Sequence, residues 1–110
     1  MSLERVVNCA VTVYNWLMIR SIRHKGLQIL YEKNDPRGVN PEHVRRLKLI
    51  LQVLDHAERP EDLLGMATLR THLLEPKSQG RWAVAVRANW RVTFRFEQGD
   101  VVLVDYEDYH

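Results

Sequence analysis

The end of the chain carries three residues that are typical of acid–base chemistry. Asp108, Tyr109 and His110 close the sequence, directly after an alternating apolar segment that begins at Val101. Alternate residues of a β-strand share one face, so Asp108 and His110 point the same way if the strand persists to the last residue. A carboxylate beside an imidazole orients the ring and favours its charged form. The spacing therefore predicts a general acid or base at the end of the chain.

A second histidine with chemical potential lies in the middle of the chain. His72 stands in an irregular stretch, residues 71–77, directly before a change of sequence pattern. Two imidazoles can serve as base and acid across one scissile bond, and the sequence leaves open which of His72 and His110 has which role. The other three histidines fall at the edges of predicted helices and are expected to be solvated: His24, His43 and His56.

Two arginines are candidates for binding a phosphate. Arg91 and Arg95 alternate with aromatic and apolar residues, so they project from one face of a predicted strand. A guanidinium in such a place can bind a phosphate bidentately and stabilise the charge of a phosphorane. The alternative is a cross-strand ion pair with Glu97 or with an acid of the last strand, and the sequence favours neither.

Length and composition limit the class of protein. The 110 residues are enough for one domain, with 16 Lys and Arg against 14 Asp and Glu. Five acids and no Lys or Arg follow Phe96, so the rest of the chain is basic. This is compatible with a nucleic-acid partner, but charge alone favours an ordinary solvated surface. The single cysteine, Cys9, excludes an internal disulfide and fits a reducing cytoplasm. The sequence contains no zinc, EF-hand, phosphate-loop or nucleophile-elbow motif.

The first half of the chain is mostly helical in pattern. Residues 1–17 repeat apolar side chains at helical spacing, but they are too few and too polar to span a membrane. A short strand is predicted over 19–23, a helix over 25–33 and a turn over 34–38. A second helix is predicted to begin at Pro41 with Asn40 as its cap, and Pro60 is predicted to end this helical hairpin before one more turn over 60–64.

The second half changes to the period of a strand. Residues 82–86 form an apolar run, and residues 90–96 alternate strictly. A hairpin turn over 98–100 leads into a last strand over 101–108, whose first residues are apolar in both alternate sets, as expected for an inner strand covered on both faces. A strand, two helices and an antiparallel meander predict an α+β fold.

Four segments together resemble the HigB toxins of the RelE/ParE superfamily. They are residues 19–27 (IRSIRHKGL), 69–72 (LRTH), 89–94 (NWRVTF) and 106–110 (YEDYH), and the resemblance covers about Met18 to His110. That range is predicted to be a RelE/ParE-like toxin domain, 18–110. Residues 1–17 have no counterpart in the family pattern. They form either an added helix or a stretch upstream of a native start at Met18.

The resemblance implies a fold, an activity and partners. The fold is an N-terminal helical hairpin packed on a small antiparallel sheet. The activity is that of a ribosome-dependent endoribonuclease that cuts messenger RNA in the cytoplasm with neither metal ion nor other cofactor. A helix-turn-helix antitoxin of the HigA type neutralises it, and its other partners are the ribosome and mRNA. A ParE-like toxin that acts on DNA gyrase is the alternative.

The resemblance also assigns residues of this chain to the site. The catalytic positions are His72, Arg91, Asp108, Tyr109 and His110. The candidates for binding RNA are Arg87, Arg95 and Lys77. The loop that holds Lys77 departs from the family pattern, so Lys77 receives no catalytic role.

Overall fold

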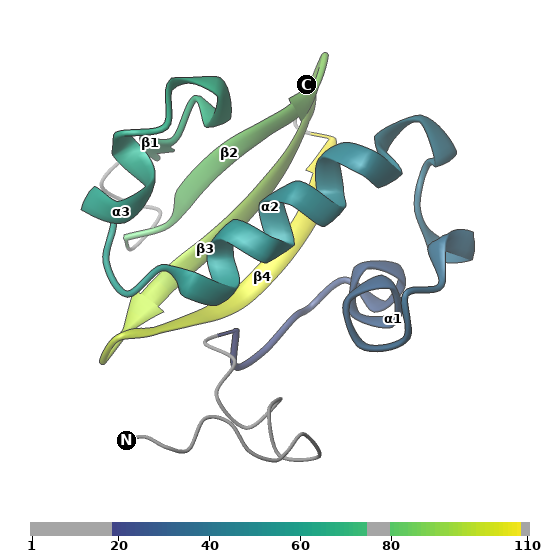
Figure 1. Ribbon diagram of the computed structural model, residues 1–110, viewed down its shortest axis with the longest axis horizontal. Helices are drawn as coiled ribbons and strands as arrows, with labels where there is room; N and C mark the ends of the chain where they lie inside the picture. Colours follow the sequence, from purple (N-terminus) through teal and green to yellow (C-terminus); the bar gives the residue numbers. More distant parts are fainter. Residues whose placement is uncertain (1–18, 75–79, 109–110) are drawn as a thin grey trace.

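A computed structural model describes residues 19–74 and 80–108 of the chain (Figure 1). The predictions for residues 1–17, Lys77, Tyr109 and His110 lie outside this range. Within the described ranges, no helix has the length and apolar character that crossing a membrane requires.

The helices form largely where the sequence predicts them. Helix α1 spans Lys25–Lys33, and its N-cap is His24, whose Nδ1 accepts a hydrogen bond from the Leu27 N–H at 3.1 Å. Two 3₁₀ turns follow, η2 (Pro36–Gly38) and η3 (Pro41–His43), before α2 (Val44–His56). Asn40 is a cap, as predicted, but it caps η3, so α2 begins three residues later than expected. The predicted extra turn is α3 (Glu61–Leu64), and a 3₁₀ turn, η4 (Ala67–Leu69), follows it.

Four antiparallel strands form one sheet in the order β1-β2-β3-β4. They are β1 (His72–Leu73), β2 (Trp82–Arg87), β3 (Trp90–Glu97) and β4 (Asp100–Asp108). The three long strands confirm the predicted meander, and the turn between β3 and β4 has positive φ at both Gln98 and Gly99, as a two-residue hairpin loop requires. The prediction of an irregular stretch at His72 was wrong. A two-residue strand is too short to show an alternating pattern.

A bulge explains why β4 is apolar in both alternate sets. Leu103 has a φ of 55° and is exposed, and the pairing with β3 shifts from Thr93–Asp105 to Arg95–Val102. Val101, Val102 and Val104 are buried around it. The predicted strand over 19–23 is reduced to two parallel bridges, which join Ile19 and Ile22 to β4. The sheet order places β4 at the edge of the four strands, flanked by these two bridges, so the prediction of an inner strand covered on both faces was wrong.

Helices α1 and α2 bury their apolar residues against one face of the sheet. Figure 1 shows α2 lying across β3 and β4, with α1 on the side of β4 and with α3 and β1 on the side of β2. Leu27, Leu47 and Leu54 pack with Val92 and Phe94 in one core. Tyr31 donates a hydrogen bond of 2.5 Å to Asp55 Oδ1, which ties α1 to α2. The predicted helical hairpin on a small antiparallel sheet is confirmed.

The contact between α1 and η2 depends on two glycines. A Cβ at Gly26 would collide with the carbonyl oxygen of Gly38. We therefore expect Gly26→Ala to lower the free energy of unfolding by about 1–3 kcal/mol in a urea titration, because backbone must move to admit the methyl group. Gly65→Ala is the matched control, since no atom lies within 4 Å of the added Cβ. Equal stabilities of the two variants would contradict this close packing.

Candidate active site

Strand register divides the site residues between two faces of the sheet. Cross-strand partners point to the same side. One face, which we call the helix face, carries Trp82, Val84, Trp90, Val92 and Tyr106 toward the helices. The opposite face, which we call the arginine face, carries His72, Ala83, Ala85, Arg91, Thr93, Arg95, Asp105 and Glu107. His72, Arg91 and Arg95, all predicted from the sequence, therefore lie on one side of the sheet.

His72 lies at the edge of the arginine face. It pairs with Ala83 of β2, and its exposed ring places Nδ1 3.3 Å from the carbonyl oxygen of Arg70. Arg70 has a φ of 52°, so the chain turns sharply just before β1. With two strand spacings across the sheet and two residues along it, the His72 and Arg91 Cα atoms are about 12 Å apart. A nucleotide can reach both side chains.

Arg91 is part of a network that one carboxylate organises. Its Nε and one terminal nitrogen donate to Glu107 Oε2 at 3.0 and 2.7 Å. Arg81 approaches the other oxygen of Glu107 at 3.4 Å and donates to Thr93 Oγ1 at 2.9 Å. The ion pair with an acid of the last strand, one of the two alternatives for Arg91, is thus present. Arg95 similarly lies 3.6 Å from Glu97. Neither pair excludes a phosphate, because carboxylate partners also hold guanidinium groups in position.

Two predicted residues lie on the other side of the sheet. Asp108 and Arg87 are both register partners of Trp90, at the end of the sheet where β2 turns into β3. Arg87 is directed toward the helices, where it lies 3.4 Å from Glu42. Asp108 is exposed at the end of β4, one residue beyond the Arg91–Glu107 pair. The register therefore places Asp108 and Arg91 on opposite faces of the sheet.

A buried aromatic cluster supports the end of β4. Tyr106 is packed between rings, with Trp90 at 4.7 Å and His24 at 5.0 Å between centroids. Its hydroxyl lies 2.6 Å from His43 Nδ1. The expectation that His43 is solvated was wrong, since only 4% of it is exposed. His24 is half-buried as a helix cap, so it is not fully solvated either. Of these three histidines, His56 is exposed as predicted. Helical periodicity does not reveal a partner 63 residues away.

Tyr106→Phe tests this support. The variant keeps the ring but leaves the buried His43 nitrogen without its hydroxyl partner, which should cost about 1–3 kcal/mol in the free energy of unfolding. Burial raises the pKa of the Tyr106 hydroxyl, so this bond involves a neutral phenol. Urea titration measures the change, and Leu103→Ala on the exposed side of the same strand is the control. An unchanged midpoint for Tyr106→Phe would show that the bond contributes nothing.

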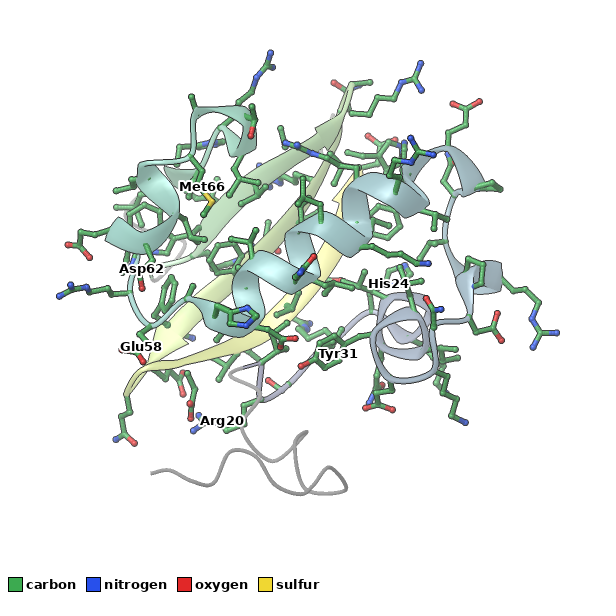
Figure 2. All side chains as sticks on the ribbon, viewed as in Figure 1. Arg20, His24, Tyr31, Glu58, Asp62 and Met66 are labelled. Atoms are coloured by element: carbon green, nitrogen blue, oxygen red, sulfur yellow. The ribbon has the colours of Figure 1, made fainter. Side chains whose placement is uncertain are left out.

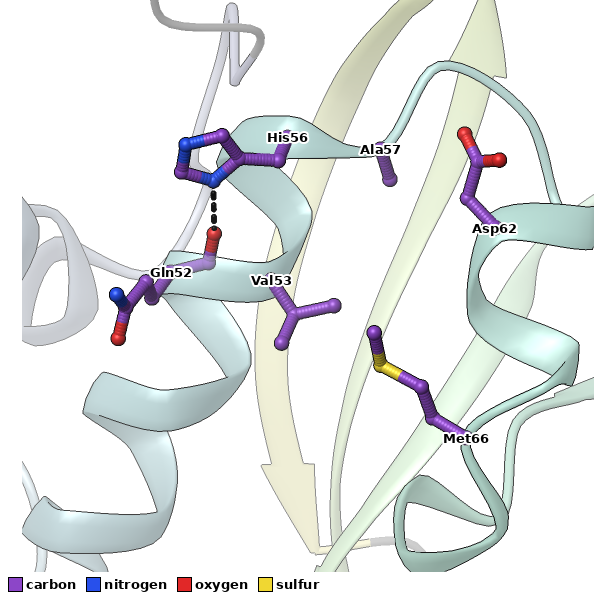
Figure 3. Close-up of a pocket in the computed structure, with 6 residues that line it drawn as sticks. All are labelled: Gln52, Val53, His56, Ala57, Asp62 and Met66. Carbon is purple, nitrogen blue, oxygen red and sulfur yellow. Dashed lines mark hydrogen bonds between the residues drawn. The ribbon is translucent and has the colours of Figure 1, made fainter.

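A hollow on the helix side is not part of this site. It has a volume of about 290 Å³ and lies between α3 and the end of α2 (Figure 3). Its titratable lining residues are His56 and Asp62, and the His56 Nδ1 lies 2.9 Å from the Gln52 carbonyl oxygen. Neither His72 nor Arg91 lines the hollow, so a molecule bound in it would not contact these two residues.

Three residues of this network were not predicted from the sequence: Arg81, Thr93 and Glu107. Arg81 precedes its strand and therefore stands outside the alternating pattern, although it is two residues from Ala83 and so shares its face. In the sequence, Glu107 is one of five acids after Phe96, and nothing distinguishes it from the others. The sequence feature that could have indicated this network is the set of small residues at 83, 85 and 93, because small side chains on one face of a sheet leave room for long side chains to lie over them.

Comparison with known proteins identifies the family of this chain. The sequence model of the family described as "RelE-like toxin of type II toxin-antitoxin system HigB" matches residues 20–110. The chain belongs to this HigB-like toxin family. A relative, the endoribonuclease HigB of Proteus vulgaris, is 42% identical over 93 residues, which are 84% of this chain and 100% of the relative. The predicted α+β fold and the predicted family are both confirmed, and membership implies a cognate antitoxin for this toxin.

Proposed function

We propose that this toxin is an endoribonuclease that cuts messenger RNA with acid, base and cation drawn from its own side chains. Family membership and the endoribonuclease relative support the activity. The single observation that carries the site is the shared face of His72 and Arg91, an imidazole and a guanidinium within reach of one nucleotide. The reaction needs no metal ion in this scheme.

The proposed reaction is an in-line displacement at phosphorus. One imidazole removes the proton of a ribose 2′-hydroxyl, and the 2′-oxygen forms a bond to the adjacent phosphorus. The bond from phosphorus to the 5′-oxygen breaks, and the second imidazole, in its protonated form, gives that oxygen its proton. The products are a 2′,3′-cyclic phosphate and a 5′-hydroxyl end. His72 and His110 fill these two roles, each worth about 10²–10⁴-fold in rate.

The remaining residues position or stabilise the reacting groups. Arg91, held by Glu107, neutralises the charge that builds on the phosphorane. Asp108 orients the imidazole of His110, and Tyr109 stacks on a base or donates to a phosphate oxygen. Arg95 and Lys77 contribute positive charge along the RNA backbone, whereas Arg87, which lies on the helix face beside Glu42, is not assigned to this path.

The ribosome supplies the rest of the positioning in this proposal. Holding RNA in an in-line pose is worth up to about 7–11 kcal/mol, and a chain of 110 residues offers little surface for it. Cleavage is therefore expected on translated messages, in the cytoplasm. The antitoxin is proposed to be a helix-turn-helix protein of the HigA type.

A translation reaction tests the function. Purified toxin is added to a reaction that translates a defined message, and the RNA ends are identified chemically. Cyclic-phosphate ends that appear only during translation support the proposal. Intact RNA with double-strand DNA breaks in cells that express the toxin would instead identify a gyrase-directed toxin.

A further inference from the structure

We propose that Arg81 is a second phosphate-binding group on the arginine face, next to Arg91. The inference rests on the proposed function for the identity of its ligand, a phosphodiester of single-stranded RNA. Its structural basis is separate, because it depends on how Arg81 is held and on what its guanidinium still offers.

The backbone of Arg81 is fixed beside the strand that carries His72. Its carbonyl oxygen accepts a hydrogen bond from the Leu74 N–H at 2.9 Å, which extends the pairing of β1 with β2 by one step. Arg81 is two residues before Ala83, the register partner of His72. Arg81 and His72 therefore project from neighbouring strands toward the same side.

The side chain of Arg81 is held across the sheet. It reaches Thr93 Oγ1 at 2.9 Å and Glu107 Oε1 at 3.4 Å, so it extends from β2 over β3 toward β4. Ala83 and Thr93, which are 0% and 1% exposed, are the small residues over which it passes. A guanidinium already held in this way loses little conformational entropy on binding an anion.

The guanidinium keeps donors for a ligand. Both contacts to Thr93 and Glu107 use a single terminal nitrogen, so Nε and the other terminal nitrogen donate to no described residue. The side chain remains 35% exposed. A guanidinium presents five N–H donors in a planar fork that matches phosphate.

Two guanidinium groups share one carboxylate at this place. Among the described residues, Glu107 is in contact with both Arg81 and Arg91, so these three side chains together carry one excess positive charge. Asp105, the register partner of Thr93, lies on the same face. Because the cluster is partly buried, that charge is screened less than an exposed one. The cluster lies on the same face as His72, between β1 and the end of β4.

The test measures RNA binding without cleavage. A fluorescent single-stranded 2′-O-methyl oligonucleotide, which has no 2′-hydroxyl to attack, is titrated with the full chain at several salt concentrations. We expect Arg81→Gln to raise Kd by about three- to tenfold and to reduce the slope of log K against log salt by about 0.7, the value for one lost phosphate contact. Arg81→Lys should keep the slope and lose part of the affinity.

Arg20→Gln is the matched control, because it removes the same charge beyond β4, at the opposite edge of the sheet from β1 and β2. Arg20 is exposed and contacts Glu97 and Asp100 near the β3–β4 turn (Figure 2). The Kd of Arg20→Gln for the oligonucleotide should change much less than the Kd of Arg81→Gln. Equal changes in both variants, or an unaltered Kd and slope in Arg81→Gln, would overturn the proposal. If Arg81→Gln does not fold, Arg81→Lys and Thr93→Val are measured in its place. An unaltered affinity for the oligonucleotide in either variant would also overturn the proposal.

This outcome is independent of the proposed catalytic role of the histidines. Binding of the uncleavable RNA does not require His72, so Arg81→Gln can be measured in a His72→Ala background as well. Loss of affinity in that background supports Arg81 even if His72→Ala still cuts RNA. Normal affinity of Arg81→Gln for the RNA in that background would overturn the proposal that Arg81 binds phosphate, and the proposed cleavage reaction would be unaffected.

Discussion

Replacing His72 with alanine is expected to lower the rate of mRNA cleavage in a translation reaction by about 10²–10⁴-fold. The ring is exposed, and its one described hydrogen-bond contact is the carbonyl oxygen of Arg70, so the variant should fold normally. The loss would come from the missing acid or base and not from unfolding. A single-turnover time course of a defined message measures the rate, and thermal unfolding checks the fold.

The neighbouring residue gives the control for His72. Leu73 lies on the same short strand and is 53% exposed, but it points to the opposite face. Leu73→Ala should therefore cut RNA at close to the rate of the unaltered toxin. If His72→Ala cuts at that rate too, His72 does not belong to the site.

Deleting His110 alone is expected to produce a loss of similar size, about 10²–10⁴-fold. The deletion removes one imidazole and leaves Tyr106, whose buried contacts support the end of β4, unchanged. Growth of bacteria that express the variant is the simplest measurement, with cleavage in a translation reaction as the quantitative one. Growth arrest equal to that of the unaltered toxin would remove His110 from the mechanism.

Asp108→Asn separates orientation from chemistry at the same end of the chain. In the proposed scheme the carboxylate of Asp108 orients the ring of His110 and does not itself transfer a proton. Asp108→Asn should therefore lower the rate of cleavage in a translation reaction, but by less than the deletion of His110 does. A rate equal to that of the unaltered toxin would mean that Asp108 does not act on His110.

The sequence predicts local structure well where the signal is local. The helix over 25–33 has the bounds of α1, and the strict alternation from Trp90 to Phe96 gives most of β3. A strand of two residues has no period, so β1 escaped prediction although it carries His72. The composition of β4 predicted an inner strand, whereas β4 is the last strand of the sheet and carries a bulge at Leu103 that the sequence did not reveal.

The site was predictable in its residue types but not in its pairings. His72 and Arg91 were identified from the sequence, and the register places both on one face. The division between the faces depends on register, which also places Asp108 and Arg87 on the other side. The burial of His43 against Tyr106 and the sharing of Glu107 by two arginines are long-range contacts that no spacing rule encodes.

The proton given to the leaving oxygen is the most direct point at which to test the mechanism. A short message is synthesised with sulfur in place of the bridging 5′-oxygen at the cleaved bond, because a thiolate leaves without needing a proton. The unaltered toxin, His72→Ala and the His110 deletion are then compared on this RNA and on the ordinary one. We predict that the sulfur restores the rate of one histidine variant and not of the other, which identifies the acid and leaves the second imidazole as the base. Failure of the sulfur to restore either variant would contradict the proposal that two imidazoles of this chain act on one phosphate.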